Sequence, residues 1–290
     1  MPLMTPYQVA DETFVIPSCV PAPFVGNVHL NTLVIRAREP VVVDTGMPVG
    51  KEEWQQALWT ILDPKDVRWI FLSHEDGDHV GSLFDLLDAC PNARLLTSWF
   101  ELGRMEVGAH RMPDIGRCVW VNDGDSFDVG DRTLHALRPP FFDSPTTRGL
   151  FDPVTGVYYS VDSFGSFVPC HVEYASEMAE SDWREGLLCL NRANHPWHAY
   201  VDEARWSTHV DRLEGLHAET IVTAHGPTIP EPMIAEAFRL IREVPRMEPW
   251  PEPTQADLEL LLTEGMGVGA HHVPMLAPSA RSSMAAEPVG

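Results

Sequence analysis

Hydrophobic and polar positions along the chain follow two periods, one typical of strands and one typical of helices. Short runs rich in β-branched residues and bounded by Pro, Asn or Gly predict strands. These predicted strands are 12–20, 29–37, 40–46, 68–72, 93–98, 118–121, 133–140, 157–161 and 221–225. Apolar residues at helical spacing predict helices at 52–62, 81–90, 206–216, 232–244 and 253–262. Helices accompany both strand-rich blocks, which predicts an α/β fold with two stacked sheets and helices outside.

The domain organisation is simple. Nothing resembles a linker before the last residues, so we expect one domain over residues 1–264. Residues 265–290 are small, Pro-rich and aperiodic, which predicts a loosely ordered C-terminal tail. No apolar run is long enough to span a membrane, and the N-terminus lacks the basic start of a secretory signal. We therefore expect a cytoplasmic protein that does not bind a membrane.

Composition narrows the classes of partner. The formal net charge of the 290-residue chain is −22, which argues against nucleic acid and anionic membranes as partners. The 5 cysteines are widely spaced and form no CxxC pair. That pattern excludes a rubredoxin-type iron site and a zinc ribbon, and predicts buried free thiols in a reducing cytoplasm. The cysteines are Cys19, Cys90, Cys118, Cys170 and Cys189.

The segment FLSHEDGDHVGS at 71–82 carries the strongest chemical signal, because four potential metal ligands follow a buried strand at once. They are His74, Asp76, Asp78 and His79. Such closely spaced carboxylates and imidazoles repel or desolvate one another unless a cation binds them. In a turning backbone the first three can converge while His79 faces a second centre, so one motif can serve two metals. The alternative is an exposed polar loop, since Asp-Gly-Asp is ordinary turn chemistry.

Potential ligands also follow other predicted strands. Asp162 ends VYYSVD, His225 ends IVTAH, and Asp143 follows the strand 133–140. Several such residues at one edge of a stacked pair of sheets indicate a metal site. Asp44 ends VVVD, and we interpret it as an acid that orients a ligand histidine or as a turn cap.

Taken together, these motifs resemble the metallo-β-lactamase superfamily, whose fold is an αββα sandwich. The usual motif of that superfamily is HxHxDH with zinc, whereas this chain has HxDxDH, with Asp76 at the second position. The chain is therefore more similar to the diiron branch, the flavodiiron proteins and their single-domain oxygen-binding relatives, with HxExDH. YSVDSFG resembles the SSDAFG of that branch, TAHGP its SHGP, and DSPTTRGLFDP its HWPDTMFTYDP-like segment. The resemblance covers roughly residues 25–230.

The resemblance implies a set of ligands for two metals. The first metal takes His74, Asp76 and the residue at 143, the second takes Asp78, His79 and His225, and Asp162 bridges both. This chain departs from the branch at two of these positions. Asp76 is one methylene shorter than the glutamate of the branch. Asp143 replaces a histidine, so it is an anionic ligand, or that coordination position is open or holds water; His135 is the alternative ligand.

The implied donors, four carboxylates and three imidazoles without a cysteine, suit iron or manganese, and they leave zinc open. We expect two metal ions, iron first, with zinc or manganese as alternatives. No flavin is expected in this chain, because it has no Gly-rich nucleotide loop and no fused flavodoxin-like domain.

The resemblance implies a diiron protein that binds and reduces or activates O₂ or NO with electrons from a separate donor protein. A hydrolase acting on a lactone, ester, thioester or phosphodiester through a metal-bridging hydroxide is the runner-up. A non-enzymatic O₂ sensor is the third hypothesis, and a homodimer stays open. His195 and His198 fall where the family lines its pocket, although a surface or helix-start position is favoured for both. The pair His271–His272 in the tail is not expected to bind metal.

Overall fold

The computed structural model describes residues 5–109 and 111–263. Two mixed sheets and a separate hairpin carry its strands. In spatial order, the first sheet contains β1 (Tyr7–Ala10), β2 (Thr13–Ile16), β5 (Thr32–Ile35), β6 (Val41–Val43), β7 (Trp69–Phe71), β8 (Arg94–Thr97) and β9 (Cys118–Trp120). The second contains β10 (Ser126–Asp128), β11 (Thr133–Leu137), β12 (Gly149–Asp152), β13 (Val157–Tyr159), β14 (Thr220–Val222) and β15 (Ile229–Pro230). The hairpin pairs β3 (Cys19–Ala22) with β4 (Gly26–His29).

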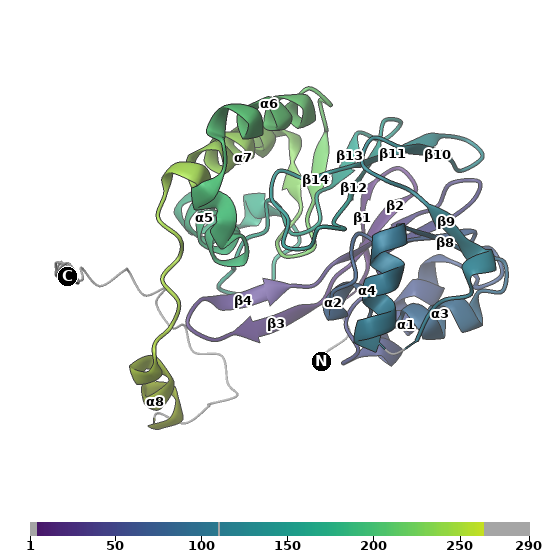
Figure 1. Cartoon of the computed structure of the whole chain (residues 1–290), viewed down its shortest axis with the longest axis horizontal. Coiled ribbons are helices and arrows are strands. Elements are labelled where there is room, and N and C mark those ends of the chain that lie inside the picture. Colours follow the sequence, from purple (N-terminus) through teal and green to yellow (C-terminus); the bar gives the residue numbers. More distant parts are fainter. Residues whose placement is uncertain (1–4, 110, 264–290) are drawn as a thin grey trace, which may run out of the picture.

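Helices cover the outer face of each sheet. On the first sheet lie α1 (Lys51–Ile61), α3 (Leu83–Ala89) and α4 (Trp99–Ala109), and on the second lie α5 (Glu180–Asn194), α6 (Glu203–Glu214) and α7 (Glu231–Glu243). The remaining helices are α2 (Gly77–Val80), α8 (Gln255–Thr263) and the 3₁₀ turns η1 (Ile115–Arg117), η2 (Ala175–Glu177), η3 (Pro196–Tyr200) and η4 (Val244–Arg246). Figure 1 shows the two helical layers on opposite sides of the stacked sheets, with α8 set apart from them.

Three apolar layers follow from this arrangement. The central layer lies between the sheets and includes Leu33, Phe71 and Tyr159, and each outer layer packs a sheet against its helices. Strands β6 and β7 carry continuous apolar runs because both of their faces are covered. The predicted αββα sandwich is therefore confirmed.

Two predicted strands are each split in the structure. The predicted strand 12–20 ends as β2 at Ile16 and resumes as β3, because Pro17 has no N–H to continue the ladder. The predicted strand 29–37 breaks after His29, because Asn31 turns away to the other sheet. The backbone N–H of Asn31 donates to the carbonyl of Ala224 at 2.8 Å, and its side chain donates to two further carbonyls nearby. These breaks create the β3–β4 hairpin, which pattern reading missed.

Some predictions from the sequence concern residues outside this description. The tail 265–290 and its pair His271–His272 lie outside the described residues, and the single domain over 1–264 stays a prediction. Within the described residues, no helix combines the length and apolar character that crossing a bilayer requires.

Candidate metal centre

Strand ends bring the candidate ligands together at one edge of the sandwich. His74, Asp162 and His225 each lie three residues beyond the end of β7, β13 and β14 (71 to 74, 159 to 162 and 222 to 225). Strands β13 and β14 are parallel neighbours, so Asp162 and His225 leave the second sheet side by side. His74 leaves the first sheet opposite them. Helix α2 begins at Gly77, within the segment that carries His74, Asp76, Asp78 and His79.

Six of the seven candidate ligands form two adjoining clusters. His74, Asp76 and Asp143 make one, and Asp78, His79 and His225 make the other. In the first, Nε2 of His74 lies 3.7 Å from Oδ2 of Asp76 and 3.6 Å from Oδ1 of Asp143. In the second, Oδ2 of Asp78 lies 3.6 Å from Nε2 of His79 and 3.5 Å from Nε2 of His225.

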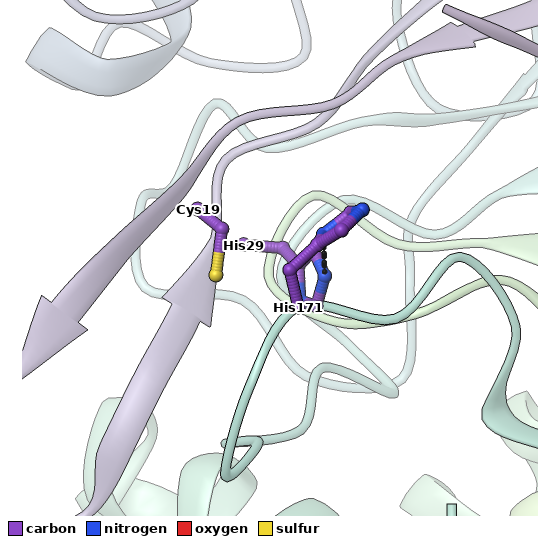
Figure 2. Close-up of side chains that lie close together, drawn as sticks. All are labelled: Cys19, His29 and His171. Carbon is purple, nitrogen blue, oxygen red and sulfur yellow. Dashed lines mark hydrogen bonds between the residues drawn. The ribbon is translucent and has the colours of Figure 1, made fainter. Parts of the chain in front are cut away.

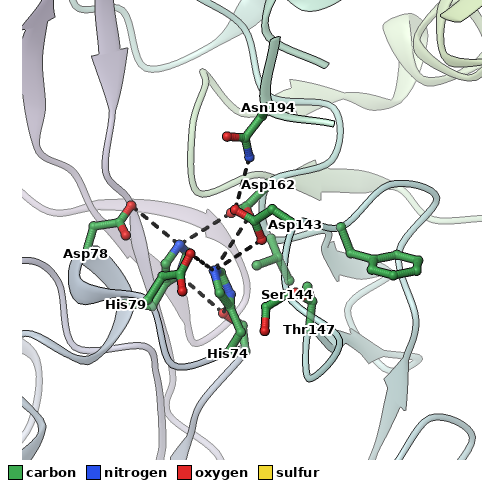
Figure 3. Close-up of polar contacts among 12 residues, drawn as sticks. His74, Asp78, His79, Asp143, Ser144, Thr147, Asp162 and Asn194 are labelled. Carbon is green, nitrogen blue, oxygen red and sulfur yellow. Dashed lines mark hydrogen bonds and ion pairs between the residues drawn. The ribbon is translucent and has the colours of Figure 1, made fainter. Parts of the chain in front are cut away.

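Asp162 faces both clusters. Its Oδ1 lies 3.3 Å from Nε2 of His79 and 3.1 Å from Nε2 of His225, and its Oδ2 lies 3.7 Å from Nε2 of His74. Figure 3 shows His74, His79 and Asp162 pointing toward one another, with Asp78 and Asp143 on either side. All seven residues predicted from the sequence are thus brought together, with the grouping that the resemblance implies.

The donor set fits metal ions. The Nε2 atoms of His74 and His79 and both carboxylate oxygens of Asp162 are buried without a hydrogen-bond partner. Buried polar atoms are almost always paired in native proteins, so four facing atoms without partners indicate a place for cations. The other ring nitrogens are engaged elsewhere, which leaves Nε2 of each histidine available as the ligand atom.

The close approach of several carboxylates is a second indication that cations bind here. Burial, together with the neighbouring carboxylates of Asp162 and Asp76, raises the pKa of Asp143 to about 7. Burial also acts to raise the pKa of Asp162, but the imidazoles of His74 and His225 hold it well below its usual value. Carboxylates that disfavour one another's charge become compatible when divalent cations lie between them.

Residue Asp44 orients the second cluster. Its Oδ2 accepts hydrogen bonds from Nδ1 of His79 at 2.8 Å, from the Ser73 hydroxyl at 2.7 Å and from the Tyr159 hydroxyl at 2.7 Å. Of the two interpretations of Asp44, orienting a histidine is the one that the contacts support.

Asp44 and Val161 adopt φ angles of 59° and 58°, in the left-handed region. Such backbone strain is stored mainly at functional sites.

Glu75 makes contacts that the sequence did not predict. It lies inside the metal-binding motif but points away from the clusters, toward Arg104, Ser144 and Thr146. Its carboxylate therefore ties the motif to the loop that carries Asp143. Only its place in the alternation of the motif could have signalled this, since residues on either side of it face the site.

The remaining histidines differ from the expectation. His195 and His198 are fully buried, so a surface position is wrong for both; His195 lies at the start of η3, whereas His198 lies in its last turn. The His195 ring stacks on Phe141 with centroids 5.5 Å apart, and its Nε2 has no hydrogen-bond partner. His135 lies within β11 and belongs to neither cluster, so it does not replace Asp143.

An αββα sandwich with two adjoining histidine–aspartate clusters at its strand ends defines a metallo-β-lactamase-type protein. The family model described as "ODP family beta lactamase" matches residues 28–226, and the chain belongs to this family. Together with the relatives described next, this match confirms the resemblance to the diiron branch.

Named relatives are consistent with that membership. The type A flavoprotein fprA of Rhodobacter capsulatus is 27% identical over 73% of this chain and 48% of that protein. The anaerobic nitric oxide reductase flavorubredoxin of Salmonella typhi is 27% identical over 47% of this chain and 28% of that protein. The rubredoxin oxygen:oxidoreductase of Desulfovibrio gigas superposes with a TM-score of 0.74 and 17% identity, covering 86% of this chain and 63% of that chain. The chain spans about half or less of the length of the curated relatives it matches.

Proposed function

We propose that this protein holds two iron ions between its two clusters and binds and reduces O₂ or NO there. The observation that carries the proposal is the carboxylate of Asp162, whose two oxygens face the two clusters at 3.1–3.7 Å. Membership of the family and the names of its oxygen- and nitric oxide-reducing relatives support it. When bound, two ferrous ions would supply two electrons for the reduction of O₂ or NO.

In this proposal each residue of the chain has a defined part. The first ion is held by His74, Asp76 and Asp143, the second by Asp78, His79 and His225, and both by Asp162. The four carboxylates balance the charge of two divalent ions, and the absence of cysteine from the set favours iron over softer metals. The hydrogen bond from Nδ1 of His79 to Asp44 fixes the ring and raises its basicity as a ligand. Electrons come from a separate donor protein, and no flavin binds to this chain.

Metal analysis tests the proposal directly. We expect protein purified without added metal to contain about two irons per chain, since the site presents donors for two ions. After anaerobic reduction, exposure to O₂ or NO should give a new absorption band and consume the gas when a reductant is supplied. Two zincs with esterase, lactonase or phosphodiesterase turnover, and no gas consumption, would support the hydrolase hypothesis instead. Reversible binding without consumption would support the sensor hypothesis.

Variants at Asp143 test the position where this chain departs from its relatives. We expect Asp143→Ala to lose about one metal ion per chain, because His74, Asp76 and the shared Asp162 would then hold the first ion weakly. Asp143→His should restore the metal content, since it introduces the histidine that the resemblance to the diiron branch implies at this position. Asn194, whose amide lies 3.3 Å from Oδ2 of Asp143, supplies a matched control in Asn194→Ala. Full metal content in Asp143→Ala would show that this residue is not a ligand.

A further inference from the structure

A second group of metal-binding side chains lies at the base of the β3–β4 hairpin. Cys19 and His29 are direct register partners in the antiparallel pair, so their side chains lie on the same face of the hairpin. His171 comes from a distant segment that is fastened to the same hairpin. The backbone of Asn27 exchanges hydrogen bonds with Val168 at 2.8 and 2.9 Å, and its side chain donates to the carbonyl of Pro169 at 2.9 Å.

The three side chains are close enough to share one ion. A ring nitrogen of each histidine and Sγ of Cys19 all lie within 4.8 Å of one another. Nε2 of His29 lies 3.0 Å from Nδ1 of His171, and Figure 2 shows the two rings joined by this contact beside the Cys19 sulfur. Two imidazole nitrogens on one tetrahedral zinc are about 3.3 Å apart, given Zn–N bonds of about 2.05 Å. The two histidine nitrogens therefore need only a small adjustment to share one ion, with the Cys19 sulfur within 4.8 Å of both.

Burial gives this group a reason to bind a cation. His29 is 1% exposed, and its Nδ1 has no hydrogen-bond partner, whichever nitrogen carries the proton. Its Nε2 lies 3.1 Å from the carbonyl of Val172 and 3.0 Å from Nδ1 of His171, and a bond to the metal would replace these hydrogen bonds.

We propose that Cys19, His29 and His171 form a second, mononuclear metal site that takes one zinc ion, with its fourth position open to water. On binding, the proton of the Cys19 thiol passes to solvent as the zinc–sulfur bond forms, so no oxidant or reductant is needed. Soft thiolate with two imidazoles is a donor set that suits zinc. The site goes beyond the proposed function and does not depend on it, because it shares no ligand with the two clusters.

Zinc at this site would also support the neighbouring metal centre. The carbonyl oxygen of His29 accepts a hydrogen bond of 3.0 Å from Nδ1 of His225. An ion that fixes His29 therefore fixes the backbone group that orients His225. Strand β4 thus connects the two sites through a single residue.

Cobalt titration of the metal-free full chain tests the site. Co²⁺ bound to a thiolate gives a near-ultraviolet charge-transfer band, and the seven residues of the two clusters include no sulfur. We expect one equivalent of the band in the unmodified protein, with zinc displacing it. Cys19→Ser and His171→Ala should lower the affinity for this cobalt by about 100-fold or more, since loss of contacts that only orient ligands already costs about 10- to 100-fold.

Cys118→Ser is the matched control, because Cys118 is half-buried like Cys19 but belongs to none of the metal-binding groups found among residues 5–109 and 111–263. It should keep the full band. Circular dichroism of each metal-free variant checks that the chain is folded, and His171→Ala gives a second reading if Cys19→Ser unfolds. Absence of the band from the unmodified protein, or its survival in Cys19→Ser, would overturn the proposal. Neither outcome would bear on iron in the two clusters.

Discussion

Replacing Asp162 by asparagine should lower the metal content from about two ions per chain to about one or none. Asp162 alone among the seven candidate ligands faces both clusters, at 3.1 Å from Nε2 of His225 on one side and 3.7 Å from Nε2 of His74 on the other. Asparagine keeps the shape of the side chain but removes its charge and replaces one oxygen by an N–H donor. That donor would point at a cation or at an imidazole ligand atom. Elemental analysis of protein grown with iron measures the effect.

Asp152→Asn is the matched control for this variant. Asp152 is also a buried aspartate of the second sheet, but it pairs with Arg132 at 3.0 Å and lies in neither cluster. Its substitution should lower stability while leaving the metal content at the level of the unmodified protein. If Asp162→Asn retained two metals, Asp162 would not be the ligand shared by both ions. Metal lost equally from both variants would show that the effect is one of folding.

The fold was predictable where pattern and burial agree. Apolar runs such as β7, and amphipathic helices such as α7, have one structure that buries their apolar side chains, so their type follows from spacing alone. Helix α4 was missed because its inner face includes the charged Glu101, which is fully buried against Arg148. From the sequence alone, Glu101 indicates a surface position, because its partner Arg148 lies 47 residues away.

The site was predictable for a related reason. His74, Asp162 and His225 all follow apolar runs, and strand ends on one edge of a sandwich must meet in space. What a pattern cannot give is the direction of each side chain in an irregular loop. Glu75 and Asp76 are adjacent acids, yet one faces Arg104 and the other faces His74. The sequence pattern does not predict the pairing of Cys19 with His29, because that pairing depends on a hairpin that splits two predicted strands.

Arg148→Met should lower the free energy of unfolding by about 3–5 kcal/mol, the usual cost of breaking one partner out of a buried ion pair. The Arg148 guanidinium is 2% exposed and contacts the carboxylate of the fully buried Glu101 at 2.5 Å. It also donates to the carbonyls of Leu72 at 2.9 Å and Val121 at 3.0 Å. Leu72 leads directly into the metal-binding motif, so the pair anchors the base of that segment. Urea denaturation of the metal-free protein measures the loss without a contribution from bound metal.

The double variant Arg148→Met, Glu101→Leu separates the charge effect from packing. It should recover part of the lost stability, because it leaves no buried carboxylate without a cationic partner. In the single variant the loss should depend on pH. Burial raises the pKa of Glu101 even with Arg148 beside it, and without the guanidinium the carboxyl of the folded state binds its proton more tightly still. The folded state then holds more protons than the unfolded state, so stability falls as pH rises above the unfolded pKa of about 4.3. A single variant whose stability rises over that range, or a double variant less stable than the single one, would contradict the assignment of Arg148 as the partner that makes buried Glu101 tolerable.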